Sequence, residues 1–221
     1  MPQANIFRWH AGIGWLVITG GGALESEDNL NIVAATLSRT VSQGPLAYVW
    51  AASDIESADL HMDLLRDLGA RTGYLVDVLT EEDDVLFHQL NEAGLIILGD
   101  GPRQETVRDA LVGAAMRGIE ESFSRGATLY AVGASSALIG AYAAEGDALV
   151  PGFGWLANSI ILPGYTPDQA ERLRGCVQRV ENGYGYGLGL GHGAALALGP
   201  RGEVEVWGNK AITVSLGQSY T

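Results

Sequence analysis

The chain has 221 residues, a formal net charge of −13 and an apolar share of 47%. This composition excludes an intrinsically disordered chain, because enough apolar surface is present to form a core. The acidic balance argues against nucleic acids and anionic membranes as partners, since both repel a negatively charged surface.

The cysteine count, the N-terminal pattern and the spacing of possible metal ligands indicate where the protein is located and whether it binds a metal. Cys176 is the single cysteine, so no internal disulfide can form, which is typical of a reducing cytosol. No basic segment followed by an apolar one marks a signal peptide, and no uncharged apolar run reaches the ~18 residues of a spanning helix. No cysteines and histidines have metal-ligand spacing. We therefore expect a cytoplasmic protein without metal or cofactor, and the five tryptophans and glycine-rich edge are compatible with a homodimer.

Strands and helices alternate through the first two-thirds of the chain. Short apolar runs predict strands at residues 15–19, 46–50, 73–76, 95–98 and 128–132. Helices are predicted after the caps Ser26 and Asp54, near 83–91 and at 104–124, the first with an apolar face of Leu30, Val33, Ala34, Leu37 and Val41. This alternation predicts a three-layer α/β/α sandwich with a mostly parallel, flavodoxin-like sheet, in a single domain covering residues 1–221.

The last third of the chain has a different pattern. Residues 159–162 are apolar, and 167–180 are predicted to be helical. Residues 186–190, 194–198 and 203–207 alternate and are separated by glycine and proline turns, which predicts a β-meander or hairpin. We expect it as a C-terminal β-hairpin addition at one edge of the sheet.

The most informative segment is residues 128–140. A predicted strand ends there in the turn Gly133-Ala134-Ser135-Ser136-Ala137, and an alanine-rich helical run follows. This layout is typical of a nucleophile elbow, in which a sharp turn between strand and helix exposes a serine hydroxyl. Ligands of parallel sheets bind beyond the carboxyl ends of the strands, so loops 20–23, 99–104 and 133–137 are expected to converge.

Five short motifs follow one another along nearly the whole chain. They are Ile-Thr-Gly-Gly-Gly at 18–22, Leu-Gly-Asp-Gly at 98–101, Gly-Ala-Ser-Ser-Ala at 133–137, Gly-Phe-Gly at 152–154 with Ser-Ile-Ile-Leu at 159–162, and Gly-Leu-Gly-Leu at 187–190 with Ala-Ala-Leu at 194–196. Their order resembles the serine peptidase family of dipeptidase E and cyanophycinase, which has a class I glutamine amidotransferase-like fold.

The resemblance implies a set of site residues. It assigns the nucleophile to Ser135 and an oxyanion hole to the backbone N–H groups of Asp100 and Ser136. Gly101 shares the turn of Asp100, and Gly21 lies in the loop expected to flank the pocket. Backbone donors fixed where negative charge develops contribute about 3 kcal/mol each to catalysis.

The family motif for the catalytic base is not retained. Where the family has Asp-Gln-His-Phe after the apolar strand, this chain has Pro163-Gly-Tyr165-Thr, so Tyr165 falls near the histidine position and could donate a hydrogen bond in the pocket. His192 occupies a glycine-lined turn near the expected site and is the candidate base. His61 and His88 are interpreted as exposed residues on polar helix faces.

Two functions from different classes follow. The first is a diverged serine hydrolase that cleaves a peptide or amide bond through Ser135, with His192 as base and a small peptide or amide as substrate. The second is a catalytically inactive member of the fold that binds a small molecule or a protein. The missing family histidine favours the second, and the ordered motifs favour the first.

Overall fold

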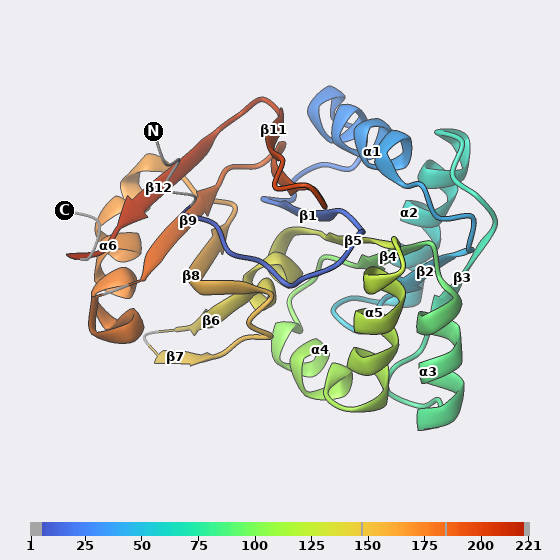
Figure 1. The fold of residues 1–221 in the computed structure, drawn as a ribbon. Helices are drawn as coiled ribbons and strands as arrows, with labels where there is room; N and C mark the ends of the chain where they lie inside the picture. Colours follow the sequence, from blue (N-terminus) through green and yellow to red (C-terminus); the bar gives the residue numbers. More distant parts are fainter. Residues whose placement is uncertain (1–5, 147, 184, 219–221) are drawn as a thin grey trace.

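The computed structural model describes residues 6–146, 148–183 and 185–218. Within these residues the strands form two sheets (Figure 1). The first sheet contains β1 (Leu16–Thr19), β2 (Leu46–Val49), β3 (Gly73–Val76), β4 (Leu95–Leu98), β5 (Thr128–Ala131), β10 (Ala194–Leu198) and β11 (Val204–Gly208). The second contains β6 (Gly140–Glu145), β7 (Ala148–Pro151), β8 (Leu156–Pro163), β9 (Tyr186–Leu190) and β12 (Ile212–Leu216).

The helices alternate with these strands. They are α1 (Glu27–Arg39), α2 (Ile55–Asp67), α3 (Asp83–Glu92), α4 (Gln104–Leu111), α5 (Ala114–Ser124) and α6 (Ala170–Arg179), with short 3-10 segments η1 (Gly133–Ile139), η2 (Pro167–Gln169) and η3 (Val180–Gly183). Ser26 accepts a hydrogen bond from the N–H of Asn29, and Asp54 accepts one from that of Ser57, so both predicted caps are confirmed. No helix formed by the described residues is both long enough and apolar enough to cross a bilayer.

The first sheet has the strand order β11-β10-β1-β5-β4-β2-β3. Strands β1 to β5 pair in parallel, while β10 pairs antiparallel with both β1 and β11. Strands β1, β2, β4 and β5 are buried along their whole length, as expected of parallel strands covered on both faces. The mostly parallel sheet and the C-terminal hairpin at its edge are therefore confirmed.

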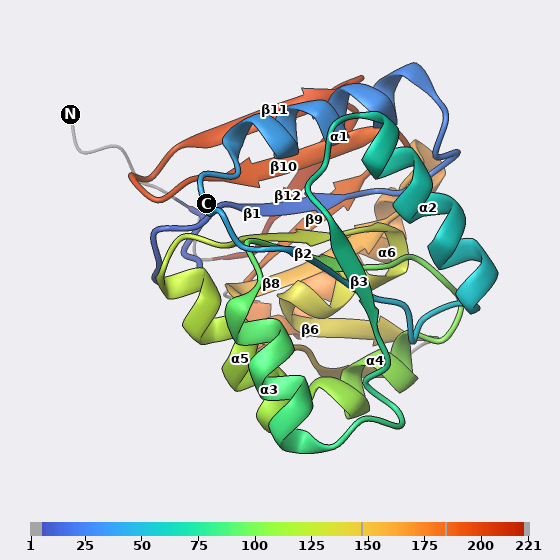
Figure 2. The same ribbon diagram turned by 90° about the vertical axis from the view of Figure 1, so that its right-hand side faces the viewer.

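Helices cover both faces of the first sheet (Figure 2). On one face, α1 and α2 contribute Ile32 and Met62 to a core shared with the sheet. On the opposite face, α3, α4 and α5 contribute Leu90, Leu111 and Ile119. This arrangement is the predicted α/β/α sandwich.

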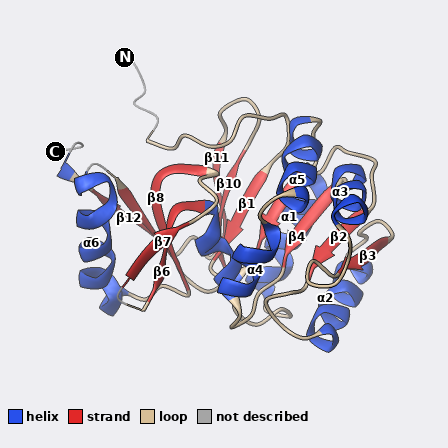
Figure 3. Ribbon diagram, turned by 90° about the horizontal axis from the view of Figure 1, so that it is seen from below, coloured by secondary structure: helices blue, strands red, loops and turns tan. Residues whose placement is uncertain are grey.

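The second sheet lies beside α4 and α5 on the same side of the first sheet, and α6 covers its outer face (Figure 3). Its inner face joins the core of the first sheet, where Leu188 of β9 and Leu196 of β10 belong to one buried cluster. The sequence analysis places 186–190 in the same meander as 194–198 and 203–207. The structure instead pairs β9 in parallel with β8, across α6, and only β10 and β11 extend the first sheet.

Three local predictions are corrected. The helix expected at 104–124 is broken at Gly113, whose φ of +102° is incompatible with an α-helix. The helical run after residue 133 is the 3-10 segment η1, which leads directly into β6. The buried face of α1 is formed by Asn29, Ile32, Val33 and Thr36, because this face of the helix packs on the first sheet.

Candidate functional site

Three loops meet at the carboxyl edge of the first sheet, after β1, β4 and β5. A Cβ atom added to Gly21 would lie 2.9 Å from Oδ2 of Asp100 and 2.9 Å from the Cα atom of Gly133. This close approach explains the glycine, which also has a φ of +73°. The three loops that contain Gly21, Asp100 and Gly133 therefore meet in space, as the sequence predicts.

The sharp turn after β5 is centred on Gly133. Its φ is +54°, a conformation that glycine adopts easily. In the described part of the chain, Asn158 and Lys210 are the non-glycine residues with positive φ, and neither belongs to this turn. The strained position of a nucleophile elbow is the residue that presents its side chain at the edge of the sheet. Here that position carries no side chain, because a Cβ atom on Gly133 would overlap the carboxylate of Asp100.

Ser135 is not at the strained position but two residues after it. Its side chain has no exposed surface, and its hydroxyl donates to the carbonyl oxygen of Gly99 at 2.5 Å. The backbone N–H of Ser135 donates to Val132, which closes the turn. Ser135 therefore links the loops after β4 and β5 from inside the protein, and its hydroxyl does not reach the surface.

The paired backbone donors expected at an oxyanion hole are present but shifted along the chain. The N–H groups of Gly101 and Ala134 both donate to Oδ1 of Asp100, each at 2.8 Å. The sequence analysis assigned these donors to Asp100 and Ser136. Ser136 is buried, and its hydroxyl accepts from the N–H of Thr19 at 3.1 Å and lies 2.8 Å from the Thr19 carbonyl oxygen. Ser136 thus joins the ends of β1 and β5.

His192 lies beside the loop after β1. Its Nδ1 is 3.1 Å from the carbonyl oxygen of Gly20, and its ring lies close to Gly164. A carbonyl only accepts, so this contact assigns a proton to Nδ1. No hydrogen bond joins His192 to Ser135, whose hydroxyl is directed to Gly99 instead. The two residues proposed as base and nucleophile are therefore held by different loops.

Tyr165 is a core residue and does not line the loops that meet at Asp100 and Gly133. Its ring packs over Gly189 of β9, where a Cβ atom would collide with it. It belongs to the buried cluster that includes Leu173 and Val177 of α6. The expectation that Tyr165 lines the pocket is corrected, because the space between α6 and the second sheet holds its ring.

The interpretation of His61 as an exposed residue is wrong, because His61 is buried and pairs with Tyr48. The hydroxyl of Tyr48 is 2.9 Å from Nδ1 of His61, and the exposed fraction of each side chain is only 3%. Burial lowers the pKa of His61 to about 4, against the opposing effect of the Asp100 charge, and it raises the pKa of Tyr48. His61 is thus neutral near pH 7. Its helical spacing from Ala58 and Leu65, both buried, was the available signal.

A cleft of about 520 Å³ is lined in part by Asp100. It lies between the start of α2 and the loop after β4, and its lining residues are Ser53, Asp54, Ser57, Asp100, Gly101, Pro102 and Arg103. The volume is within the range of small-molecule sites, which is roughly 300–1,000 Å³. Among the described residues, no group of three or more His, Cys, Asp or Glu side chains is placed to hold a metal ion.

Comparisons with known proteins bear on the fold. No family model matches the chain, and no curated protein matches it. The crystal structure of a peptidase from an acI-B1 Actinobacterium matches with a TM-score of 0.72 and 16% identity over 95% of this chain and 97% of the other. A protein proposed to be a peptidase E, from Listeria monocytogenes EGD-e, matches with a TM-score of 0.66 and 14% identity over 88% of this chain and 98% of the other.

The chain has a peptidase E-like fold. The TM-scores support a shared architecture, whereas identities of 16% and 14% carry over no chemistry, which depends on the residues of this chain. In this peptidase E-like fold, Oδ1 of Asp100 is held by two backbone donors, while Oδ2 has no hydrogen-bond partner among the described residues. The free oxygen can accept a hydrogen bond from an N–H or O–H group of a ligand in the cleft.

Proposed function

We propose that this chain is a catalytically inactive member of the peptidase E-like fold, whose cleft binds a small peptide or amide-type ligand without cleaving it. The observation that carries the proposal is the position of the Asp100 carboxylate on the N–H groups of Gly101 and Ala134. In an elbow site, the N–H of the residue after the strained turn stabilises the oxyanion. A carboxylate bound to that donor occupies the place of the oxyanion and repels negative charge that would develop nearby.

The nucleophile and the base support the same proposal. Gly133 has no side chain at the strained turn, and the hydroxyl of Ser135 is buried against Gly99. A serine needs a base within hydrogen-bond reach to become nucleophilic. His192 instead contacts Gly20, and among the described residues no hydrogen bond joins the hydroxyl of Ser135 to an imidazole.

The cleft retains groups suited to a peptide or amide ligand. Oδ2 of Asp100 is available to accept a peptide N–H or an ammonium group. Arg103 lies in the same cleft and can bind a carbonyl or carboxylate oxygen. A ligand with a donor at one end and an acceptor at the other fits these two partners.

Turnover of small esters and amides distinguishes the two functions. We expect the wild-type protein to hydrolyse p-nitrophenyl esters, p-nitroanilides and a dipeptide panel no faster than buffer, because the hydroxyl of Ser135 is buried and the N–H groups of Gly101 and Ala134 already donate to Asp100. The variants Ser135→Ala and His192→Ala should give the same background rate. Wild-type turnover that disappears in Ser135→Ala would establish the hydrolase and overturn the proposal.

Binding is tested separately with alaninamide and dialanine as probes. The variant Asp100→Asn keeps an oxygen for the N–H groups of Gly101 and Ala134 but replaces the second carboxylate oxygen with an NH₂ group that cannot accept a hydrogen bond. We expect it to weaken probe binding about tenfold, the loss typical of one hydrogen bond to a charged group. Asp63→Asn, which changes an exposed carboxylate of α2, is the matched control. Equal losses in both variants, or no binding to the wild type, would contradict a ligand site at Asp100.

A further inference from the structure

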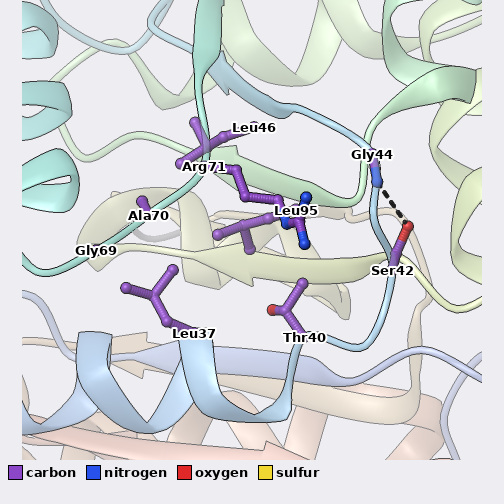
Figure 4. Close-up of a pocket in the computed structure, with 9 residues that line it drawn as sticks. All are labelled: Leu37, Thr40, Ser42, Gly44, Leu46, Gly69, Ala70, Arg71 and Leu95. Carbon is purple, nitrogen blue, oxygen red and sulfur yellow. Dashed lines mark hydrogen bonds between the residues drawn. The ribbon is translucent and has the colours of Figure 1, made fainter.

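A second cavity lies at the opposite edge of the first sheet, where β2 and β4 begin (Figure 4). Its volume is about 220 Å³. It is partly open to solvent, because Gly69 and Arg71 are exposed. The end of α1, the loop before β2, the segment after α2 and the start of β4 line it through Leu37, Thr40, Ser42, Gly44, Leu46, Gly69, Ala70, Arg71 and Leu95. The strands of the sheet separate it from the cleft at Asp100.

The base of this cavity is apolar. Leu46 and Leu95 are almost completely buried, with exposed fractions of 2% and 4%, and Leu37 packs against the same cluster. An apolar cavity of about 150 Å³ is large enough to hold benzene. The space here therefore suits one aromatic ring or a short branched alkyl group.

Arg71 supplies the one charged side chain of the lining. Figure 4 shows it extending over Leu95 toward the segment of Ser42 and Gly44. Its guanidinium donates to Oε1 of Gln43, a neutral acceptor. Among the described residues Arg71 forms no ion pair, although acidic residues outnumber Lys and Arg by 26 to 13 in this chain.

The surroundings favour a ligand with a single negative charge over one with two. A carboxylate can accept two parallel hydrogen bonds from a guanidinium and is a stronger acceptor than an amide oxygen. The cavity lies beside the carboxyl ends of α1 and α2, whose partial negative charge repels anions, and it repels a dianion such as phosphate more strongly than a monoanion. A single cation above an apolar base matches a monoanion with a hydrocarbon group.

We infer that this cavity binds a small monocarboxylate, with the hydrocarbon group on Leu37, Leu46 and Leu95 and the carboxylate on Arg71 in place of the Gln43 amide. Gln43 then competes with the ligand, because its amide oxygen accepts the hydrogen bond of the Arg71 guanidinium when the cavity is empty. This site is separate from the Asp100 cleft, and its ligand does not depend on the function proposed there.

The binding site is mapped by titrating benzoate and isovalerate into the isotopically labelled protein and recording backbone amide shifts. We expect saturable shifts at Gly44, Gly69 and Leu95, with a dissociation constant on the order of 1 mM for so small a ligand. Benzyl alcohol, which has the ring without the charge, and inorganic phosphate should bind at least about tenfold more weakly. Absence of saturable benzoate shifts, or shifts centred on Gly101 and Ala134, would overturn the inference.

Variants of Arg71 and Gln43 test the role of each residue in binding. Arg71→Gln should weaken benzoate binding by about tenfold or more, and Gln43→Glu should also weaken it, because an internal carboxylate then occupies Arg71. Gln43→Ala should tighten binding by removing the competitor. Arg66→Gln, at an exposed arginine of α2 outside the cavity, is the control and should leave binding unchanged. Equal affinity in wild type, Arg71→Gln and Gln43→Glu would contradict the assignment.

Discussion

At the scale of single residues, the site depends on the pairing of Gly133 with Asp100. The elbow pattern correctly located a sharp turn after β5, but it assigned the functional position to Ser135. A glycine directly after a strand is the residue that adopts positive φ without steric cost, so the shift to Gly133 has a physical reason. The contact with Asp100 could not be predicted, because it depends on how two separate loops meet in space.

Restoring a side chain at the turn tests this pairing. Gly133→Ala should lower the free energy of unfolding by about 3 kcal/mol, because it adds backbone strain and displaces the Asp100 carboxylate. Gly146→Ala is the matched control, since Gly146 has a φ of +57° but open space around it. It should lose only about 1 kcal/mol. Asp100→Gly should recover part of the loss in Gly133→Ala when urea unfolding is compared across the double-mutant cycle; additive effects would contradict the contact.

The buried imidazole makes stability depend on pH. His61 has a pKa of about 4 in the folded protein, and about 6.5 is usual for the unfolded chain. Between these values the unfolded chain binds more protons, so stability falls as the pH drops. From pH 7.5 to pH 5 we expect His61 to account for a loss of about 2 kcal/mol. His61→Gln keeps an acceptor for Tyr48 and should reduce this loss in urea unfolding, whereas an unchanged pH slope would contradict a neutral buried His61.

At the scale of elements, the parallel strands were predictable because each is a short apolar run bounded by turn residues. β3 and β4 have the predicted bounds, and the ends of β1, β2 and β5 differ from the prediction by one residue. The second sheet was not predictable in the same way. Its β8–β9 pair joins segments that flank α6, and β12 pairs with β9 after an intervening hairpin. Such pairings are set by packing between distant segments, which local periodicity does not encode.

Replacing two glycines of helical regions with alanine should change the stability of the protein in opposite directions. Gly113 breaks the region between α4 and α5 with a φ of +102°, so Gly113→Ala should destabilise the protein by about 1 kcal/mol. Gly175 lies inside α6 with open space around it, so Gly175→Ala should stabilise it by up to about 1 kcal/mol. Thermal unfolding of both variants measures the difference. Stabilisation by Gly113→Ala would indicate one continuous helix instead of a break.

At the scale of the whole molecule, the two sheets share one buried cluster. Leu188 of the second sheet and Leu16 and Leu196 of the first belong to it. The division of the strands into two sheets therefore does not imply two independent folding units. We expect one cooperative unfolding transition for the entire chain.

Truncation of Leu188 tests this cooperativity. Leu188 has no exposed surface, so Leu188→Ala should lower the free energy of unfolding by about 2–5 kcal/mol. Circular dichroism and tryptophan fluorescence should report the same shifted midpoint, because the cluster loses packing on both sheets. Val206→Ala, at a partly exposed position of β11, is the control and should have a smaller effect. Separate midpoints for the two probes would show that the sheets unfold independently.

We propose that the sharp turn after β5 of this peptidase E-like fold carries no reactive serine. The most direct test is the intact mass of the protein after incubation with a serine-directed fluorophosphonate. We expect no added mass, because Ser135 is buried and donates its hydrogen to Gly99, and because Gly133 occupies the strained turn. A stoichiometric mass increase that maps to Ser135 and is absent in Ser135→Ala would contradict the account.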